Sequence, residues 1–74
     1  MTKLPVVSGD QCISALERVG YQIIRTRGSH VRLKCPARMP VTVPRHRELD
    51  PGLLRKILRT AELSIEEFHK LLKG

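Results

Sequence analysis

The 74-residue sequence has no tryptophan, one tyrosine, one phenylalanine and only two cysteines. With so few aromatic rings, the core must be built mainly from aliphatic side chains, and a large apolar cofactor pocket is not expected. Cys12 and Cys35 are too far apart for a CxxC zinc pair and too few for a disulfide framework, so we interpret both as reduced core residues. No segment approaches the roughly 20 consecutive apolar residues that span a bilayer. The start of the chain, with Pro5, does not resemble a signal peptide, and we expect a cytoplasmic protein.

Positive charge is what the sequence has in excess. Fourteen lysines and arginines face seven aspartates and glutamates, which gives a formal net charge of +7. Such an excess stabilises contact with a polyanion through Coulomb attraction and counterion release, so nucleic acid is the first partner to consider. At this length the chain buries only about 60% of the surface that it exposes when unfolded, and we expect a single domain over residues 1–74.

Three segments have apolar residues at helical spacing and begin at residues that cap helices. Ser8 with Gln11, and Ser64 with Glu67, have the spacing of a capping box, and Asp50 before a proline is also a strong helix start. Gly20 is suited to end the first helix. The sequence therefore predicts one helix over residues 9–19, a second from Pro51 through Ala61, and a last short one after Ser64.

Between the first two helices, three segments have the composition of strands, at residues 21–26, 30–35 and 41–43. Gly28 provides a turn between the first two, while prolines bound the third, with a loop at residues 36–40 before it and Pro44 as its end. The expected order is α-β-β-β-α-α. Strands joined by short connections favour an antiparallel sheet, so we predict an α+β fold with a three-stranded sheet and the helices on one face.

The second strand separates an apolar face from a basic one. Because successive side chains of a strand point to opposite faces, His30, Arg32 and Lys34 share one face. Histidine has an unperturbed pKa of about 6.5 and can act as acid or base in RNA cleavage, while nearby cations can stabilise the charge of a phosphorane. The same alternation is expected of any half-buried sheet, so the pattern alone also fits an ordinary solvated face.

Other basic residues allow two interpretations each. His46, between two arginines, is able to supply a second proton-transfer group, but it is also a typical surface-loop residue. Arg55, Lys56 and Arg59 form a basic helix patch that suits phosphates, and the same positions are ordinary solvent-facing ones. His69, on the last helix among charged residues, is expected to be solvated.

Several ordered motifs together resemble one known family. They are Gly28-Ser29-His30 at the hairpin, Val41-Thr42-Val43-Pro44 in the third strand, Leu54-Arg55-Lys56-Ile57-Leu58 in the second helix, and the segment from Ala61 to Phe68. In this order the chain resembles the HicA (YcfA-like) toxin family over nearly its whole length. The resemblance implies a double-stranded-RNA-binding-like fold, a ribosome-independent messenger RNA endonuclease (mRNA interferase) of a type II toxin–antitoxin system, and a HicB-type antitoxin that blocks its site.

The resemblance also implies a site. The catalytic histidine of the family falls on His30, with Gly28 and Ser29 as the turn that positions it, and no metal or cofactor is implied. To the RNA-binding residues we add Arg32 and Lys34 from strand parity, and Arg55 and Lys56 from the basic helix.

Two other kinds of function fit the same charge and sheet. A non-catalytic RNA-binding module can recognise duplex RNA by its shape and phosphates, and its function would survive the loss of His30. A protein-interaction domain could instead dock an acidic partner on the basic face. Salt-sensitive RNA binding would favour the first over the second.

Overall fold

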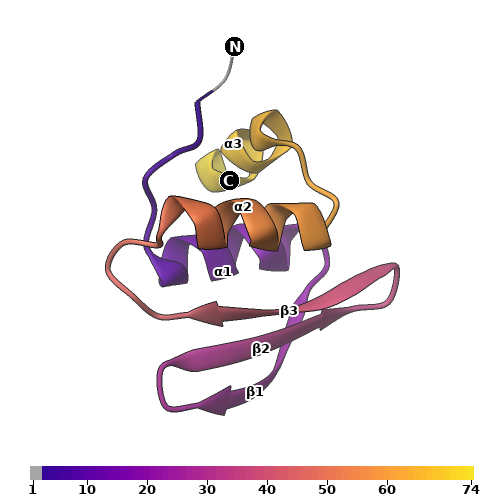
Figure 1. Ribbon diagram of the computed structural model, residues 1–74. Coiled ribbons are helices and arrows are strands. Elements are labelled where there is room, and N and C mark those ends of the chain that lie inside the picture. The colour runs from indigo at the N-terminus through magenta and orange to yellow at the C-terminus, as the bar shows by residue number, and fades with distance from the viewer. Residues whose placement is uncertain (1–2) are drawn as a thin grey trace.

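The computed structural model describes residues 3–74 and confirms the expected order of elements (Figure 1). The elements are α1 (Gly9–Arg18), β1 (Gln22–Arg27), β2 (His30–Cys35), β3 (Arg38–Pro44), α2 (Pro51–Thr60) and α3 (Ile65–Lys73). The strands form one antiparallel sheet in the order β1-β2-β3. The helices lie on one side of this sheet, with α1 and α2 next to it and α3 packed on α1. The fold is α+β and consistent with the double-stranded-RNA-binding-like arrangement that the sequence predicts.

The capping residues begin the helices as predicted. The Ser8 hydroxyl accepts from the Gln11 amide (3.1 Å), and the Gln11 side-chain oxygen accepts from the Ser8 amide (2.9 Å). Ser64 and Glu67 repeat this reciprocal pair, and these hydrogen bonds lower the pKa of the Glu67 carboxyl. Asp50 accepts from two amides of the first turn of α2. None of the helices in residues 3–74 is long and apolar enough to cross a membrane.

The second strand separates two faces as its alternation predicts. Val31, Leu33 and Cys35 are buried against the helices, while His30 and Lys34 are exposed on the other face. A two-residue turn joins β1 to β2, and Gly28 adopts the left-handed φ of 59° that this turn requires. The turn pairs the ends of the two strands directly and fixes which residues of β1 stand beside those of β2.

The third strand is longer than predicted, and the expected loop at residues 36–40 is wrong. Only residues 36 and 37 form the turn, after which β3 continues from Arg38 to Pro44. Proline is tolerated here because β3 is an edge strand, and Pro40 lies next to the irregular pairing between Leu33 and Cys35 of β2. Pro40 therefore lies within the strand, whereas Pro44 ends it as predicted.

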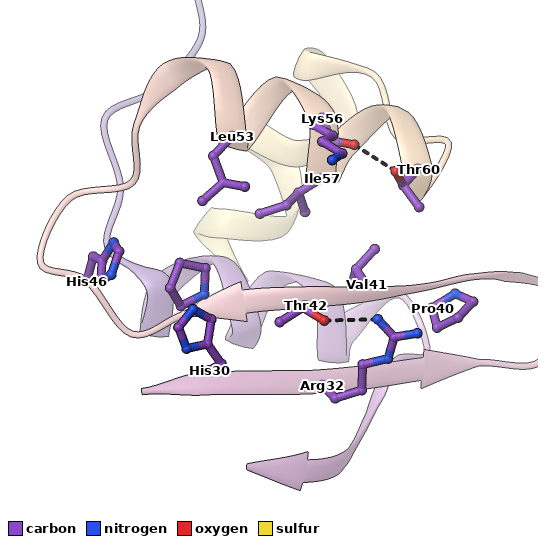
Figure 2. A pocket seen from close by; sticks show the side chains of 11 residues that line it. His30, Arg32, Pro40, Val41, Thr42, His46, Leu53, Lys56, Ile57 and Thr60 are labelled. Carbon is purple, nitrogen blue, oxygen red and sulfur yellow. Dashed lines mark hydrogen bonds between the residues drawn. The ribbon is translucent and has the colours of Figure 1, made fainter. Parts of the chain in front are cut away.

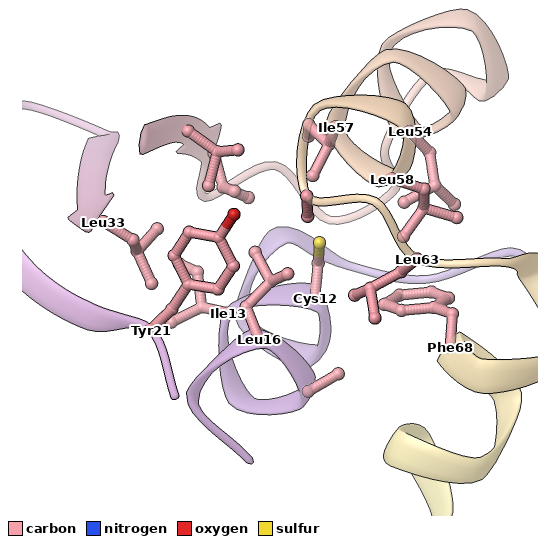
Figure 3. Packing of buried hydrophobic residues seen from close by; sticks show 14 of the residues in the cluster. Cys12, Ile13, Leu16, Tyr21, Leu33, Leu54, Ile57, Leu58, Leu63 and Phe68 are labelled. Atoms are coloured by element: carbon pink, nitrogen blue, oxygen red, sulfur yellow. The ribbon is translucent and has the colours of Figure 1, made fainter. Parts of the chain in front are cut away.

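The core lies between the sheet and the helices, and its two aromatic rings are those of Tyr21 and Phe68 (Figure 3). Tyr21, which we predicted as the first strand residue, precedes β1 and is buried, with its hydroxyl donating to the Met39 carbonyl (2.8 Å). Phe68 is fully buried from α3. Cys12 and Cys35 are both free and buried, as predicted. Burial raises the pKa of the Cys12 thiol to about 12.

Candidate active site

The face of the sheet that carries no helix is basic. Register pairs Arg27 with His30 and Arg25 with Arg32, so arginines of β1 stand directly beside the residues that the sequence singled out on β2. No aspartate or glutamate occurs between residues 22 and 44. A face with several cations and no anion attracts a phosphate chain.

A groove of about 460 Å³ opens between β3 and α2 (Figure 2). Its floor and walls combine apolar side chains of β3 and α2 with polar groups from three elements. Figure 2 shows His30 and Arg32 reaching up beside β3 while Lys56 comes from α2. The lining residues are His30, Arg32, Pro40, Val41, Thr42, Pro44, His46, Leu53, Lys56, Ile57 and Thr60.

A second, smaller hollow of about 250 Å³ adjoins the groove on the sheet. It is lined by Arg25, Arg27, His30, Arg32 and Thr42. His30, Arg32 and Thr42 belong to both hollows, so the two form a continuous polar surface that runs from α2 across the strands.

One cation of the groove is held by a side-chain contact. The Arg32 guanidinium donates to the Thr42 hydroxyl (Nη1···Oγ1 2.9 Å), across the pairing of β2 with β3. Arg32 is half-buried, whereas Lys56 on the opposite wall is exposed. A fixed guanidinium provides a planar donor set for a phosphate, and a mobile ammonium adds a second positive charge.

The connection between β3 and α2 is tied to the rest of the site by its backbone. The Arg45 amide donates to the Ser29 carbonyl (2.7 Å), and the Gly9 amide donates to the His46 carbonyl (2.9 Å). Gly9 permits this close approach, since a Cβ there would lie 1.9 Å from the Pro44 carbonyl oxygen. The residues around His46 are thereby fixed against both the start of α1 and the turn before His30.

The structure brings together only some of the residues that the sequence predicted. His30, Arg32 and Lys56 line one groove. Gly28 and Ser29 form the turn just before His30. Lys34 shares the basic face but lies farther along β2, paired with Gln22. Arg55 lies away from the groove on α2, in a separate hollow whose lining includes Leu63, Ser64 and Ile65.

Other residues of the site were missed or left open. Arg27 was within reach of sequence reasoning, because a two-residue turn at residues 28 and 29 places it opposite His30. Arg25 was within reach for the same reason, because the register set by the turn runs unbroken to the pair of Arg25 with Arg32, and the irregularity begins only beyond it, between Arg25 and Ile23. His46 and Thr42 enter the groove only through the packing of α2 beside β3.

His69 is less solvated than expected. It is half-buried, with Nε2 2.8 Å from the Lys3 carbonyl oxygen, and it is not among the groove residues. Within residues 3–74, no group of three or more His, Cys, Asp and Glu side chains is arranged to hold a metal ion. The chemistry that the groove residues themselves offer is proton transfer by imidazole and charge stabilisation by arginine and lysine.

A known protein family matches most of the chain. The model of the family described as the HicA toxin of bacterial toxin–antitoxin systems matches residues 9–63. The chain belongs to the HicA toxin family. The matched range covers α1, the whole sheet, α2 and every residue that lines the groove, and leaves α3 outside. HicA toxins are generally ribonucleases, and membership implies an antitoxin partner. No curated protein matches the chain.

Proposed function

We propose that this HicA toxin is an endoribonuclease that cleaves messenger RNA in the cytoplasm with His30 as its catalytic histidine. The observation that carries the proposal is the convergence of His30 with Arg32 and Lys56 in one groove, from two different elements. A histidine that can transfer a proton and two cations that can stabilise negative charge are groups that a phosphodiester transfer uses when the nucleophile comes from the RNA itself.

The proposed reaction is a transesterification within the RNA strand. The 2′-oxygen forms a bond to the adjacent phosphorus as its proton is removed, the bond from phosphorus to the 5′-oxygen breaks, and that oxygen takes up a proton. The products are a 2′,3′-cyclic phosphate end and a 5′-hydroxyl end. His30 carries out one of the two proton transfers, and Arg32 and Lys56 stabilise the extra negative charge on the phosphorane.

The remaining predicted residues have supporting roles in this proposal. Gly28 and Ser29 position His30 through the turn, whose Ser29 carbonyl is held by Arg45. A Cβ at residue 28 would meet nothing within 4 Å, so the turn leaves open space for a sugar–phosphate chain. Lys34 extends the basic face for the same chain. Arg55, outside the groove, stays a prediction of the sequence for RNA contact.

The antitoxin partner is proposed to be of the HicB type. The groove and the basic face are exposed and have no acidic residue in the strands, so an acidic antitoxin segment would compete with RNA for the same cations. Inhibition by occupation of the site follows from this complementarity.

The experiment is RNA cleavage in vitro, together with growth arrest on induction, for the wild type and His30→Ala. His69→Ala is the matched control, because it removes a histidine outside the groove. Protein levels are matched and circular dichroism checks the fold. We expect the wild type and His69→Ala to cleave and arrest growth and His30→Ala to do neither.

Two results would point to other functions. Equal cleavage by all three proteins would remove His30 from catalysis. Salt-sensitive RNA binding without cleavage by the wild type would favour a non-catalytic RNA-binding module, and salt-insensitive or absent RNA binding would favour a protein-interaction domain.

A further inference from the structure

We propose that His46 is the second proton-transfer group of the groove and acts with His30 as a catalytic pair. This inference rests on the proposed ribonuclease function and extends it to a residue of the loop between β3 and α2. Both imidazoles line the same groove, and Figure 2 shows both at the end of the groove nearest the start of α2.

The backbone holds the two histidines relative to each other by a short path. Ser29, the neighbour of His30, accepts from the amide of Arg45, which is the neighbour of His46 (2.7 Å). The His46 carbonyl accepts from Gly9 (2.9 Å), where a Cβ would collide with the backbone of residues 44 and 45. These main-chain contacts leave the His46 imidazole free, because its carbonyl, and not its ring, anchors the loop.

The surrounding charges suit a phosphate between the two rings. Arg32 and Lys56 line the same groove, and Arg27 pairs with His30 across the hairpin. The one ion pair formed by the described residues joins Arg45, the neighbour of His46, to Asp10 of α1 at 2.5 Å. No aspartate or glutamate is among the groove residues.

Two histidines complete the proton balance of the transesterification. One removes the proton of the 2′-hydroxyl as the bond from oxygen to phosphorus forms. The other gives a proton to the 5′-oxygen as the bond from phosphorus to that oxygen breaks. No further reactant is required, and a general acid is dispensable when the leaving group is already a stable anion.

The test compares two substrates of different leaving group. One is an RNA oligonucleotide with an ordinary ribose leaving group, and the other is uridine 3′-(4-nitrophenyl phosphate), whose nitrophenolate needs no proton. The proteins are wild type, His30→Ala, His46→Ala, His46→Gln and His69→Ala, measured in single-turnover cleavage. His46→Gln keeps a polar side chain of similar reach but transfers no proton.

We expect both His46 variants and His30→Ala to cleave RNA at least about 100-fold more slowly than the wild type, in the range that general acid–base groups contribute. On the activated ester, one of the two histidine positions should regain most of the wild-type rate, and the other should not. The position that is rescued is the general acid. His69→Ala should match the wild type on both substrates.

The outcomes separate this inference from the function on which it rests. If the wild type cleaves and depends on His30 while the His46 variants keep the wild-type rate on RNA, the pair is wrong and the proposed function stands. Equal losses on both substrates at both positions also overturn the pair, because they show no group specific to the leaving oxygen. A wild type that cleaves neither substrate overturns both proposals.

Discussion

Replacing Gly9 by alanine tests the contact that holds the His46 loop. In the interior of an ordinary helix this change stabilises by about 1 kcal/mol, since glycine is the poorer helix former, and the gain is smaller at Gly9, the first residue of α1. Here the added Cβ would lie 1.9 Å from the Pro44 carbonyl oxygen and 2.8 Å from the Arg45 Cα. The atoms that the Cβ would meet belong to the backbone and cannot rotate away as the end of a side chain can. The start of α1 and the loop must therefore move apart by about 1 Å.

We expect the overpacking to outweigh the gain in helix propensity and to lower the free energy of unfolding by about 2 kcal/mol. For a domain of this size, that corresponds to a decrease in Tm of about 10 °C. Thermal unfolding followed by circular dichroism measures it, with Gly52→Ala as the matched control in the first turn of α2. A Cβ at Gly52 would meet only a carboxylate oxygen of Asp50, at 3.1 Å, so its effect should be much smaller.

A Gly9→Ala protein with an unchanged or higher Tm would refute this reasoning, because it would mean that the loop moves away from the added Cβ without loss of stability.

The same variant also tests the positioning of His46. The Gly9 amide donates to the His46 carbonyl, and displacing the loop disturbs this bond. RNA cleavage at a temperature where the variant is still folded should therefore fall below that of the wild type, while Gly52→Ala should not show this loss.

Three further predictions concern stability and charge. Burial raises the pKa of the Cys12 thiol to about 12, so the stability that comes from keeping the thiol neutral is complete below about pH 8.5 and is lost as pH rises toward 12. The urea midpoint of the wild type should fall over this pH range, and that of Cys12→Ala should fall less. Equal pH dependence of the two proteins would contradict this prediction. Ser64→Ala should lower the free energy of unfolding, measured with urea, by about 1 kcal/mol, and Ser64→Thr should lower it much less. Equal urea midpoints for the two variants would disprove the capping contribution. Arg32→Met should slow RNA cleavage about tenfold or more, and Lys34→Met should slow it less, because only Arg32 of the two lines the groove. Similar cleavage rates for the two variants would exclude a role of the Arg32 guanidinium in the reaction.

Much of the fold follows from local sequence signals. The Ser8–Gln11 and Ser64–Glu67 pairs mark helix starts through hydrogen bonds between near neighbours, so sequence spacing alone determines them. Strand parity placed His30 on the face away from the core, because side chains of a strand alternate whatever the strand packs on. These signals predicted the order of elements and the exposed histidine correctly.

The groove itself could not be predicted from such signals. It exists because α2 lies beside β3, and residues 40 and 60 become neighbours across it through packing that has no periodic trace in the sequence. The length of β3 was missed for a related reason. A proline rules out a central strand but is tolerated in an edge strand, and which strand lies at the edge is a property of the whole sheet.

The arrangement separates the residues that stabilise this small domain from those that are proposed to act on RNA. The core residues lie between sheet and helices, while His30, His46 and Lys56 are exposed and are not part of the buried core. What positions the two histidines is main-chain hydrogen bonding from Arg45 and Gly9, which persists whatever side chains stand at residues 30 and 46. Substitution of either imidazole should therefore change the chemistry of the groove without loosening the fold, and a loss of cleavage in those variants can be assigned to proton transfer.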